Sequence, residues 1–246
     1  MFLQGWYGLS DEELEFQVND RLSFQQFLDF PNIIPDYSTI WRFREDLAED
    51  NTDDKIWSEL QNQINEKHIS VEKGVIQDAS FVIAEPGKTD SGMGNRGQSA
   101  KTSRNRDGSW TKKGKKSYFG YKVHTKMQRG SKIIKELAVT TARVSDNAID
   151  LTKPDEIVYR DKGYTGTKTN AIGNGTMKRG NLTPHEHLRN KRIQSKRSQG
   201  EHPFGTIHRA MNGGKTKLTT VYRVFTQQLF VFAAYNLFRL MSLVNK

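Results

Sequence analysis

Apolar residues near the start of the chain recur at the spacing of an α-helix. Leu14, Val18 and Leu22 are four positions apart and would lie on one face of a helix. The segment Ser-Asp-Glu-Glu at 10–13 has Ser and Glu at the spacing of a capping box, which is typical of a helix N-terminus. The pattern predicts an amphipathic helix that begins after Ser10.

A second short helix is predicted after two prolines interrupt this pattern. Ile40, Phe43 and Leu47 return at helical spacing after a Ser-Thr pair, so they would form another apolar stripe. We therefore expect residues 1–70 to be a small helical region.

From position 71 onward the pattern is that of strands. Residues 75–83 are apolar on both faces except for Gln77, Asp78 and Ser80, as expected for a central strand covered on both sides. Residues 157–159, Ile-Val-Tyr, predict another buried strand.

An antiparallel hairpin is predicted between these two strands. A turn at 129–131 joins a strand ending near position 127 to a strand over 133–140. The first of these strands would have one apolar face and one face exposed to water. Its apolar positions are Phe119, Tyr121, Val123, Thr125 and Met127, and its polar positions are Gly120, Lys122, His124 and Lys126.

The remaining segments complete the predicted architecture. Residues 87–116 are rich in Gly, Ser, Lys and Arg without apolar periodicity, which predicts a long mobile basic loop. Helices are expected near the C-terminus, where Phe225, Leu229, Phe232 and Phe238 would serve core or dimer packing. The fold class predicted for 71–246 is α/β, or α+β, around a mixed sheet.

Charge divides the chain at the same point. The net charge is +10, but residues 1–70 hold 15 acidic and 5 basic residues, whereas residues 71–246 hold 13 acidic and 33 basic ones. A surface this basic favours a polyanionic partner; the alternative is a basic surface that serves only solubility. The acidic region would pack on the basic one or on a second subunit, although its short helices also allow a DNA-reading helix-turn-helix.

The location is predicted from what the sequence lacks. It has no Cys, which fits an intracellular protein. The apolar run at 229–235 is far shorter than the roughly 20 residues that cross a bilayer, and no signal-peptide pattern opens the chain.

Three acids stand out against this basic background. Asp78 lies within an apolar strand, where an ionised carboxylate needs a compensating cation or metal. Asp161 follows the strand at 157–159. Pro203 fits the first turn of a helix and places Glu201 at or just before its start, from where it could face inward with Phe204. If the three carboxylates converge, they suit two Mg²⁺ ions and phosphoryl transfer; taken singly, each could be a paired surface residue.

Six segments give this chain a strong resemblance to a known family. They are GLSDEELEFQVNDRLSFQQFLDF, PDYSTIWRFREDL, DASFVIAEP, TTARVSDNAIDL, EIVYRDKGYTG and LRNKRIQSKRSQGEHPFGTIHR. Together they resemble the DDE transposases of prokaryotic insertion sequences in the IS-five group, within the IS-four-like superfamily, over nearly the whole chain.

The resemblance implies a fold, an activity and its partners. The fold would be an RNase H-like catalytic domain after a helical N-terminal region that serves assembly or DNA-end recognition. The enzyme would cleave DNA at the terminal inverted repeats of an element and join the 3′-hydroxyl to target DNA. It would use Mg²⁺ or Mn²⁺, most simply two ions, and act as a homodimer or higher oligomer in the cytoplasm, on the nucleoid and on no membrane.

The resemblance also assigns residues. Asp78, Asp161 and Glu201 match the family's catalytic, metal-binding Asp, Asp and Glu. The superfamily signature Tyr-x2-Arg-x3-Glu-x6-Lys is met at Arg197 and Glu201 but not at Gln194 or His208, and His holds phosphate less firmly than Lys. For each predicted DNA-contacting cation the alternative is a solvated surface charge. These residues are Lys112, Lys113, Lys115, Lys116, Arg160, Lys162, Arg192, Lys196, Arg197, His208 and Arg209.

Two other motifs are given structural interpretations, and two other functions remain open. His185-Glu186-His187 follows a proline and predicts a surface cluster at a helix start, and Gly173-Asn174-Gly175 predicts a turn. The competing functions are a catalytically inactive, transposase-derived DNA-binding protein and an RNase H-like nuclease without strand transfer.

Overall fold

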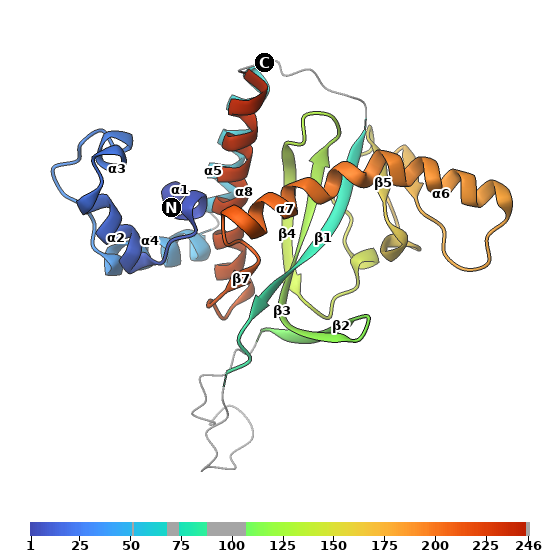
Figure 1. Ribbon diagram of the computed structural model, residues 1–246, viewed down its shortest axis with the longest axis horizontal. Helices are drawn as coiled ribbons and strands as arrows, with labels where there is room; N and C mark the ends of the chain where they lie inside the picture. The colour runs from blue at the N-terminus through green and yellow to red at the C-terminus, as the bar shows by residue number, and fades with distance from the viewer. Residues whose placement is uncertain (51, 68–73, 88–106, 245–246) are drawn as a thin grey trace, which may run out of the picture.

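The computed structural model describes residues 1–50, 52–67, 74–87 and 107–244 (Figure 1). The predicted helical region is confirmed, and its first helices lie beside the long C-terminal helix, away from the sheet (Figure 1). The helices are α1 (Phe2–Tyr7), α2 (Asp11–Asp20), α3 (Leu22–Phe27), α4 (Tyr37–Asp50) and α5 (Thr52–Glu66).

The first predicted helix is confirmed except at its end. The hydroxyl of Ser10 accepts the backbone N–H of Glu13 at 3.2 Å and so caps α2, which buries Leu14 and Val18. Leu22 is 70% exposed, so its prediction as part of the stripe was wrong. The reason is that α2 ends at Asp20 and Leu22 begins a separate helix.

The second predicted helix is α4, with a different inward-facing residue. Ile40 and Leu47 are buried as expected, but Phe43 is about half exposed. Arg44 turns inward instead, because its guanidinium donates to Asp11 of α2, with Nη1 at 2.9 Å from Oδ1. This ion pair joins the two helices.

A mixed sheet forms the body of the chain after α5. Strand β1 lies at its centre, antiparallel to β3 on one side and parallel to β5 on the other, and β5 is parallel to β6. β2 and β4 pair with successive parts of β3, and β7 pairs with the end of β1. The strands are β1 (Val75–Ala84), β2 (Ser109–Lys113), β3 (Lys116–Gln128), β4 (Ile134–Thr141), β5 (Ile157–Arg160), β6 (Gly173–Thr176) and β7 (Lys215–Thr216).

The central strand, the β3–β4 hairpin and the strand at 157–159 are thus confirmed, and the fold is RNase H-like as expected. The predicted water-exposed face of β3 was wrong. Lys122, His124 and Lys126 are all buried. The Nζ of Lys122 lies 2.7 Å from Asp146, and that of Lys126 lies 2.8 Å from Glu136. Buried cations on this face are therefore neutralised by acids of β4 and of the chain after it.

Two predicted irregular segments contain regular structure. Of the predicted loop 87–116, residues 88–106 lie outside the described residues, but 109–116 form the hairpin of β2 with the start of β3. The predicted turn at 173–175 is strand β6. Added methyl groups at Gly173 and Gly175 would lie 2.9 Å from Ile157 and 2.7 Å from Tyr159, so glycine lets β6 approach β5 closely.

The C-terminal helices are present as expected. Leu229 and Phe232 lie fully buried in the core on α8, which fits the core interpretation of this helix. Phe238 is 42% exposed and contacts the ring of Trp6 edge-on at 5.9 Å. Within the described ranges no helix is both long and apolar enough to span a bilayer. The helices are α6 (Pro184–Arg197), α7 (Glu201–Ala210) and α8 (Val221–Val244), with short 3₁₀ turns η1 (Asp146–Ala148), η2 (Lys162–Tyr164) and η3 (Ser198–Gly200).

Candidate active site

Asp78 and Asp161 are brought together by the register of two parallel strands. Val75 is paired with Val158 and Ile76 with Tyr159. The same offset places Asp161, directly after β5, beside Asp78 on β1. Because neighbouring strands lie about 4.8 Å apart, the two carboxylates share one region of the sheet.

Asp78 lies in an apolar strand, and its surroundings disfavour the ionised form of its carboxyl group. Its side chain is 16% exposed, and burial raises its pKa to about 6. Arg197 Nη2 at 3.3 Å from Oδ2 and the N–H of Ala79 at 2.9 Å from Oδ1 oppose that rise. The charge of Asp161 adds to it. Arg197 thus compensates the charge of Asp78 only in part.

Asp161 is fixed by the backbone that follows it. Its Oδ1 accepts the N–H of Gly163 at 2.7 Å, so Asp161 caps the 3₁₀ turn η2. The chain turns sharply there, and Tyr164 becomes buried. Burial, followed by the charges of Asp78, Asp146 and Asp161, raises the pKa of the Tyr164 hydroxyl. The charges of all three acids therefore act on the Tyr164 hydroxyl.

Asp146 was not predicted as part of this site. A methyl group at Gly163 would lie 2.9 Å from Asp161 Oδ1 and 3.0 Å from Asp146 Oδ2, so both carboxylates border the same small space. Lys122 Nζ holds Asp146 Oδ1 at 2.7 Å. The available signal was its place in TTARVSDNAIDL, one of the segments that carry the family resemblance, but no apolar periodicity surrounds it.

Glu201 begins α7, as the proline two residues later predicted. Its carboxylate is 68% exposed, so the expectation that it faces inward with Phe204 was wrong. Arg197 links it to the other acids, since Nη1 lies 3.9 Å from Glu201 Oε1 while Nη2 contacts Asp78. Among the described residues, no three His, Asp or Glu side chains are grouped closely enough to hold a metal ion together.

The predicted DNA-contacting cations fall into two groups. Arg160 is fully buried and bound to Gln77 and Asp150, and Arg197 is occupied by Asp78 and Glu201. Arg160 is therefore not available to phosphate. The others lie at the surface, where Lys196 Nζ contacts the Tyr159 hydroxyl at 3.2 Å and His208 Nε2 contacts Ser80 at 3.3 Å. The exposed residues are Lys112, Lys113, Lys115, Lys116, Lys162, Arg192, Lys196, His208 and Arg209.

The His185-Glu186-His187 cluster is at a helix start, as predicted. The Thr183 hydroxyl accepts the N–H of Glu186 at 3.3 Å, and the Glu186 carboxylate accepts the N–H of Thr183 at 2.9 Å. This capping box and Pro184 begin α6, so Glu186 is occupied in a structural role.

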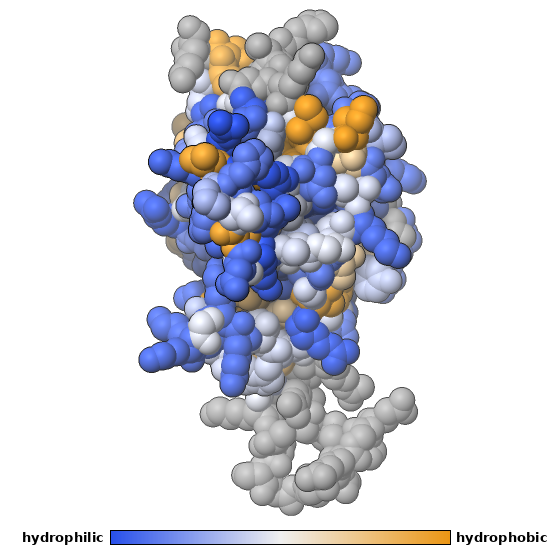
Figure 2. All heavy atoms as spheres, turned by 90° about the vertical axis from the view of Figure 1, so that its right-hand side faces the viewer, coloured by the Kyte–Doolittle hydropathy of each residue, from blue (hydrophilic) through white to orange (hydrophobic). Residues whose placement is uncertain are grey.

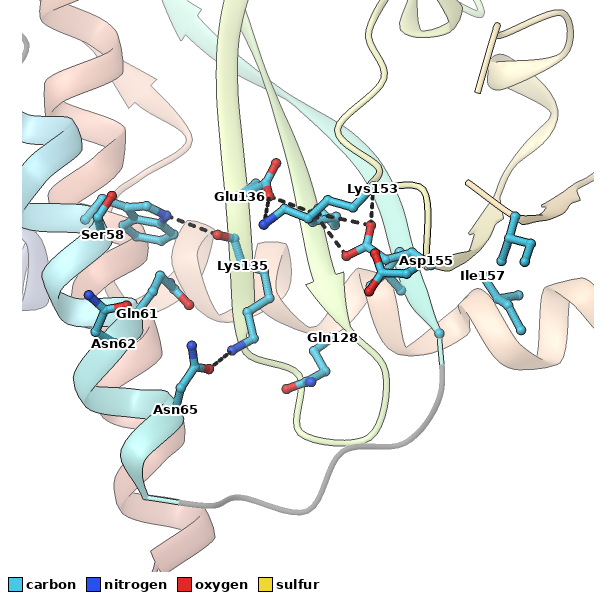
Figure 3. Close-up of a pocket in the computed structure, with 16 residues that line it drawn as sticks. Ser58, Gln61, Asn62, Asn65, Gln128, Lys135, Glu136, Lys153, Asp155 and Ile157 are labelled. Carbon is cyan, nitrogen blue, oxygen red and sulfur yellow. Dashed lines mark hydrogen bonds and ion pairs between the residues drawn. The ribbon is translucent and has the colours of Figure 1, made fainter. Parts of the chain in front are cut away.

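A pocket of about 940 Å³ lies at the other end of these strands (Figure 3). It borders the beginnings of β1 and β5, whereas Asp161 follows the end of β5. Two of its acids are paired with a lysine, because Lys126 binds both Glu136 and Glu156. We assign this pocket no part in the site.

The chain matches two family models. One, described as "Transposase DDE domain", matches residues 70–237, and one described as "Transposase domain (DUF772)" matches residues 1–46. The "Transposase for insertion sequence element IS1106" of Neisseria meningitidis serogroup B is 24% identical over 208 residues, which are 76% of this chain and 72% of that relative. No solved structure matches. Since the DDE model covers well over half of the sequence, the chain belongs to the DDE transposase family of metal-dependent enzymes that cleave DNA and transfer its strands.

Proposed function

We propose that this transposase cuts at the terminal inverted repeats of an insertion sequence and joins the freed ends to target DNA, with Asp78, Asp161 and Glu201 as its catalytic acids. The observation that carries the assignment is the shared register of β1 and β5, which sets Asp78 and Asp161 side by side. Our proposed division into a helical region, 1–70, and a catalytic domain, 71–246, follows the change in charge and in secondary structure.

Two of the three proposed acids are placed where they could bind a divalent metal ion, and the third, Glu201, would have to turn inward. Asp78 and Asp161 supply hard carboxylate oxygens, which Mg²⁺ and Mn²⁺ prefer. The raised pKa of Asp78 reflects a carboxylate whose charge its surroundings compensate incompletely. We propose that these two acids hold two such ions and that Glu201 joins them after turning inward and leaving Arg197. The ions would neutralise charge on the phosphate and on the attacking and leaving oxygens.

The reaction itself needs no covalent protein intermediate. In the first step a water oxygen attacks phosphorus, the bond from phosphorus to the 3′ oxygen breaks, and a 3′-hydroxyl is released. In the second step that hydroxyl attacks a target phosphodiester, and a new 3′ oxygen leaves. Asp78 and Asp161 would hold the metal ions, which when bound would supply charge stabilisation at the phosphodiester. Lys162, exposed beside Asp161, is suited to contact a non-bridging oxygen.

The surface supports an extended DNA contact. Figure 2 shows that the face bearing α6 is predominantly hydrophilic. Exposed Arg192 and Lys196 lie on that helix, and His208 and Arg209 end α7. Such cations bind backbone phosphates regardless of sequence. A protein with this substrate would be found with chromosomal DNA, so we propose a nucleoid location in a prokaryotic cell.

The N-terminal helices support assembly of at least two copies. These helices and the segment between α3 and α4 expose large apolar side chains. The region is acidic and would repel phosphate. We propose that this surface contacts a second copy, as holding two element ends together requires. The most exposed residues are Phe16, Leu22, Phe27, Phe30 and Ile33.

The test is cleavage and joining of a duplex that carries the inverted repeats flanking the gene. We expect 3′-hydroxyl ends and strand-transfer products with Mg²⁺ or Mn²⁺, and none with EDTA or with Asp161→Ala. Pre-cleaved ends separate the alternatives, because a nuclease without strand transfer cuts but never joins them. Binding without metal-dependent products would indicate an inactive DNA-binding protein. Products that survive both EDTA and Asp161→Ala would refute the assignment.

A further inference from the structure

The hairpin of β2 with the start of β3 is a strongly cationic projection. Residues 109–118, SWTKKGKKSY, include four lysines and no acid, and all four lysines are exposed. Lys113 and Lys116 are direct cross-strand partners. Like charges directly opposite each other in a hairpin are destabilising, and a bound anion would relieve that repulsion.

The base of this hairpin is anchored to the body of the domain. The carboxylate of Asp107 accepts the N–H of Val221 at 3.0 Å, which ties it to the start of α8. The hydroxyl of Ser109 accepts the N–H of Arg143 at 2.8 Å. The hairpin therefore presents its lysines from a fixed platform.

Trp110 is the large aromatic side chain that this platform exposes. It is 56% exposed, although Trp is a residue that proteins bury on average. Its ring rests edge-on against the buried Phe119, with ring centres 5.3 Å apart. Phe119 therefore packs against the indole of Trp110. Lys112 lies two residues further along β2, so its side chain is on the same face as Trp110.

The opposite face of the hairpin is connected, through Phe81 and Lys122, to Asp146. Phe81 and Tyr118 stack with ring centres 5.2 Å apart, and the Nζ atoms of Lys113 and Lys122 lie over Phe81 at 5.9 and 5.6 Å. Lys122 also holds Asp146, which borders the space beside Asp161. These contacts reach from the hairpin to Asp146, whose carboxylate borders the same small space as that of Asp161.

We propose that this hairpin binds a DNA strand next to the cleaved phosphodiester, with Trp110 stacked on an unpaired base and the lysines on the backbone. The inference rests on the proposed function for its location but concerns a separate contact. Charge identifies the partner class, because a hairpin with four lysines and no acid complements a polyanion. The exposed indole identifies the unpaired base, because bases inside a duplex already stack on each other and aromatic platforms bind single strands.

The test measures binding of the full-length Asp161→Ala protein in EDTA to a 20-nucleotide oligo(dT) and to a fully paired 20-base-pair duplex. Cleavage plays no part in it, so its failure is distinct from failure of the proposed function. We expect Trp110→Ala to bind oligo(dT) about 5- to 160-fold more weakly, the range for one lost base stack. Trp110→Phe should stay within about threefold of the parent, because a ring remains to stack on a base.

Fluorescence and salt dependence make the assignment specific. Tryptophan quenching by oligo(dT) should be largely lost in Trp110→Phe. Replacing Lys112 and Lys115 with Ala should lower the slope of log affinity against log salt by about 1.4 for two phosphate contacts on a single strand. The control is Tyr222→Ala, which removes an aromatic side chain that is 68% exposed outside the hairpin and should bind as the parent does.

Three outcomes would overturn the inference. The first is unchanged oligo(dT) affinity in folded Trp110→Ala, and the second is full quenching in Trp110→Phe. The third is an equal loss of affinity for oligo(dT) and duplex in Trp110→Ala, which would mean that the indole does not contact an unpaired base. Thermal unfolding of each variant identifies loss of fold, and Trp110→Phe remains informative if Trp110→Ala is unstable.

Discussion

Gly163→Ala should impair catalysis while leaving the fold nearly intact. Gly163 has a backbone conformation open to any residue, so the substitution introduces no φ strain. Its effect is steric, because the new methyl carbon would lie 2.9 Å from Asp161 Oδ1 and 3.0 Å from Asp146 Oδ2. Ordinary contacts of this kind begin at 3.4 Å. One or both carboxylates must therefore move by about half an ångström.

The size of the effect follows from this displacement. A misplacement of about 1 Å can cost roughly 100-fold in rate, so about half that distance should cost roughly tenfold in the rate of cleavage, more if Asp161 alone moves. Stability should change little, because Asp161 and Asp146 are partly exposed and can adjust toward solvent. DNA affinity should also be preserved, since no basic residue is removed.

Single-turnover cleavage of the inverted-repeat duplex measures the rate, and oligonucleotide binding and thermal unfolding provide the comparisons. Gly205→Ala is the matched control, because a methyl group at Gly205 in α7 would have the Arg209 side chain as its nearest neighbour at 3.8 Å. Wild-type cleavage by a folded Gly163→Ala protein would show that the position of Asp161 does not limit the reaction. A large loss of thermal stability would show that the space beside Gly163 serves folding instead.

Three further predictions concern stability, measured by urea unfolding. Burial raises the pKa of Asp78 from 3.8 to about 6, so the ionised carboxylate destabilises the metal-free folded state above pH 6, whereas below pH 4 the carboxylate is protonated and the destabilisation is absent. Asp78→Asn should therefore stabilise the protein in EDTA by up to about 3 kcal/mol at pH 8 and by little at pH 4. An equal effect at both pH values would contradict this. Asn236, fully buried on α8, accepts the N–H of Ile134 at 2.9 Å and donates to its carbonyl at 2.8 Å, which Gln61 also contacts at 2.9 Å. Asn236→Ala removes the side-chain partner of the Ile134 N–H but leaves Gln61 on the carbonyl, so it should cost about 1–3 kcal/mol. A cost below about 0.5 kcal/mol would mean that water replaces the amide. Arg44→Ala removes the guanidinium that binds Asp11 and should lower the free energy of unfolding by about 3 kcal/mol. If the losses in Arg44→Ala and Asp11→Ala simply add in the double variant, the two side chains are not coupled and the prediction fails.

The parts of the fold that could be predicted were those whose signal is local. The run at 75–83 is apolar on both faces, and it forms the central strand because only a doubly covered position buries such a segment. Asp78 and Asp161 could be singled out as candidate site residues because each is a carboxylate in or directly after an apolar strand. Pro203 located the start of α7 because its ring restricts it to the first turn of a helix.

The parts that could not be predicted depend on partners distant in the sequence. Lys122 and Lys126 are indistinguishable from surface lysines until Asp146, Glu136 and Glu156 fold against them. Arg160 likewise appeared to be a cation flanking Asp161, yet it is buried with Asp150 and Gln77.

Glycine-rich β6 and the carboxylate of Glu201 show two other limits. β6 has turn-like residues because it packs closely on β5, which a single sequence does not reveal. Pro203 located the start of α7, but the Glu201 carboxylate points to solvent and toward Arg197. A pattern of apolar positions indicates neither the close packing of β6 on β5 nor the direction of the Glu201 carboxylate.

The pairing of β1 with β5 has a consequence for how this family can vary. The separation of Asp78 and Asp161 is set by hydrogen bonds between adjacent strands and not by the length of chain that links them. Segments inserted or removed between the two strands would therefore leave these two proposed catalytic acids in alignment. A single residue inserted within β1 before Asp78 would instead turn that side chain to the other face of the sheet, so natural variation in length should be tolerated in the connections and excluded from the strand.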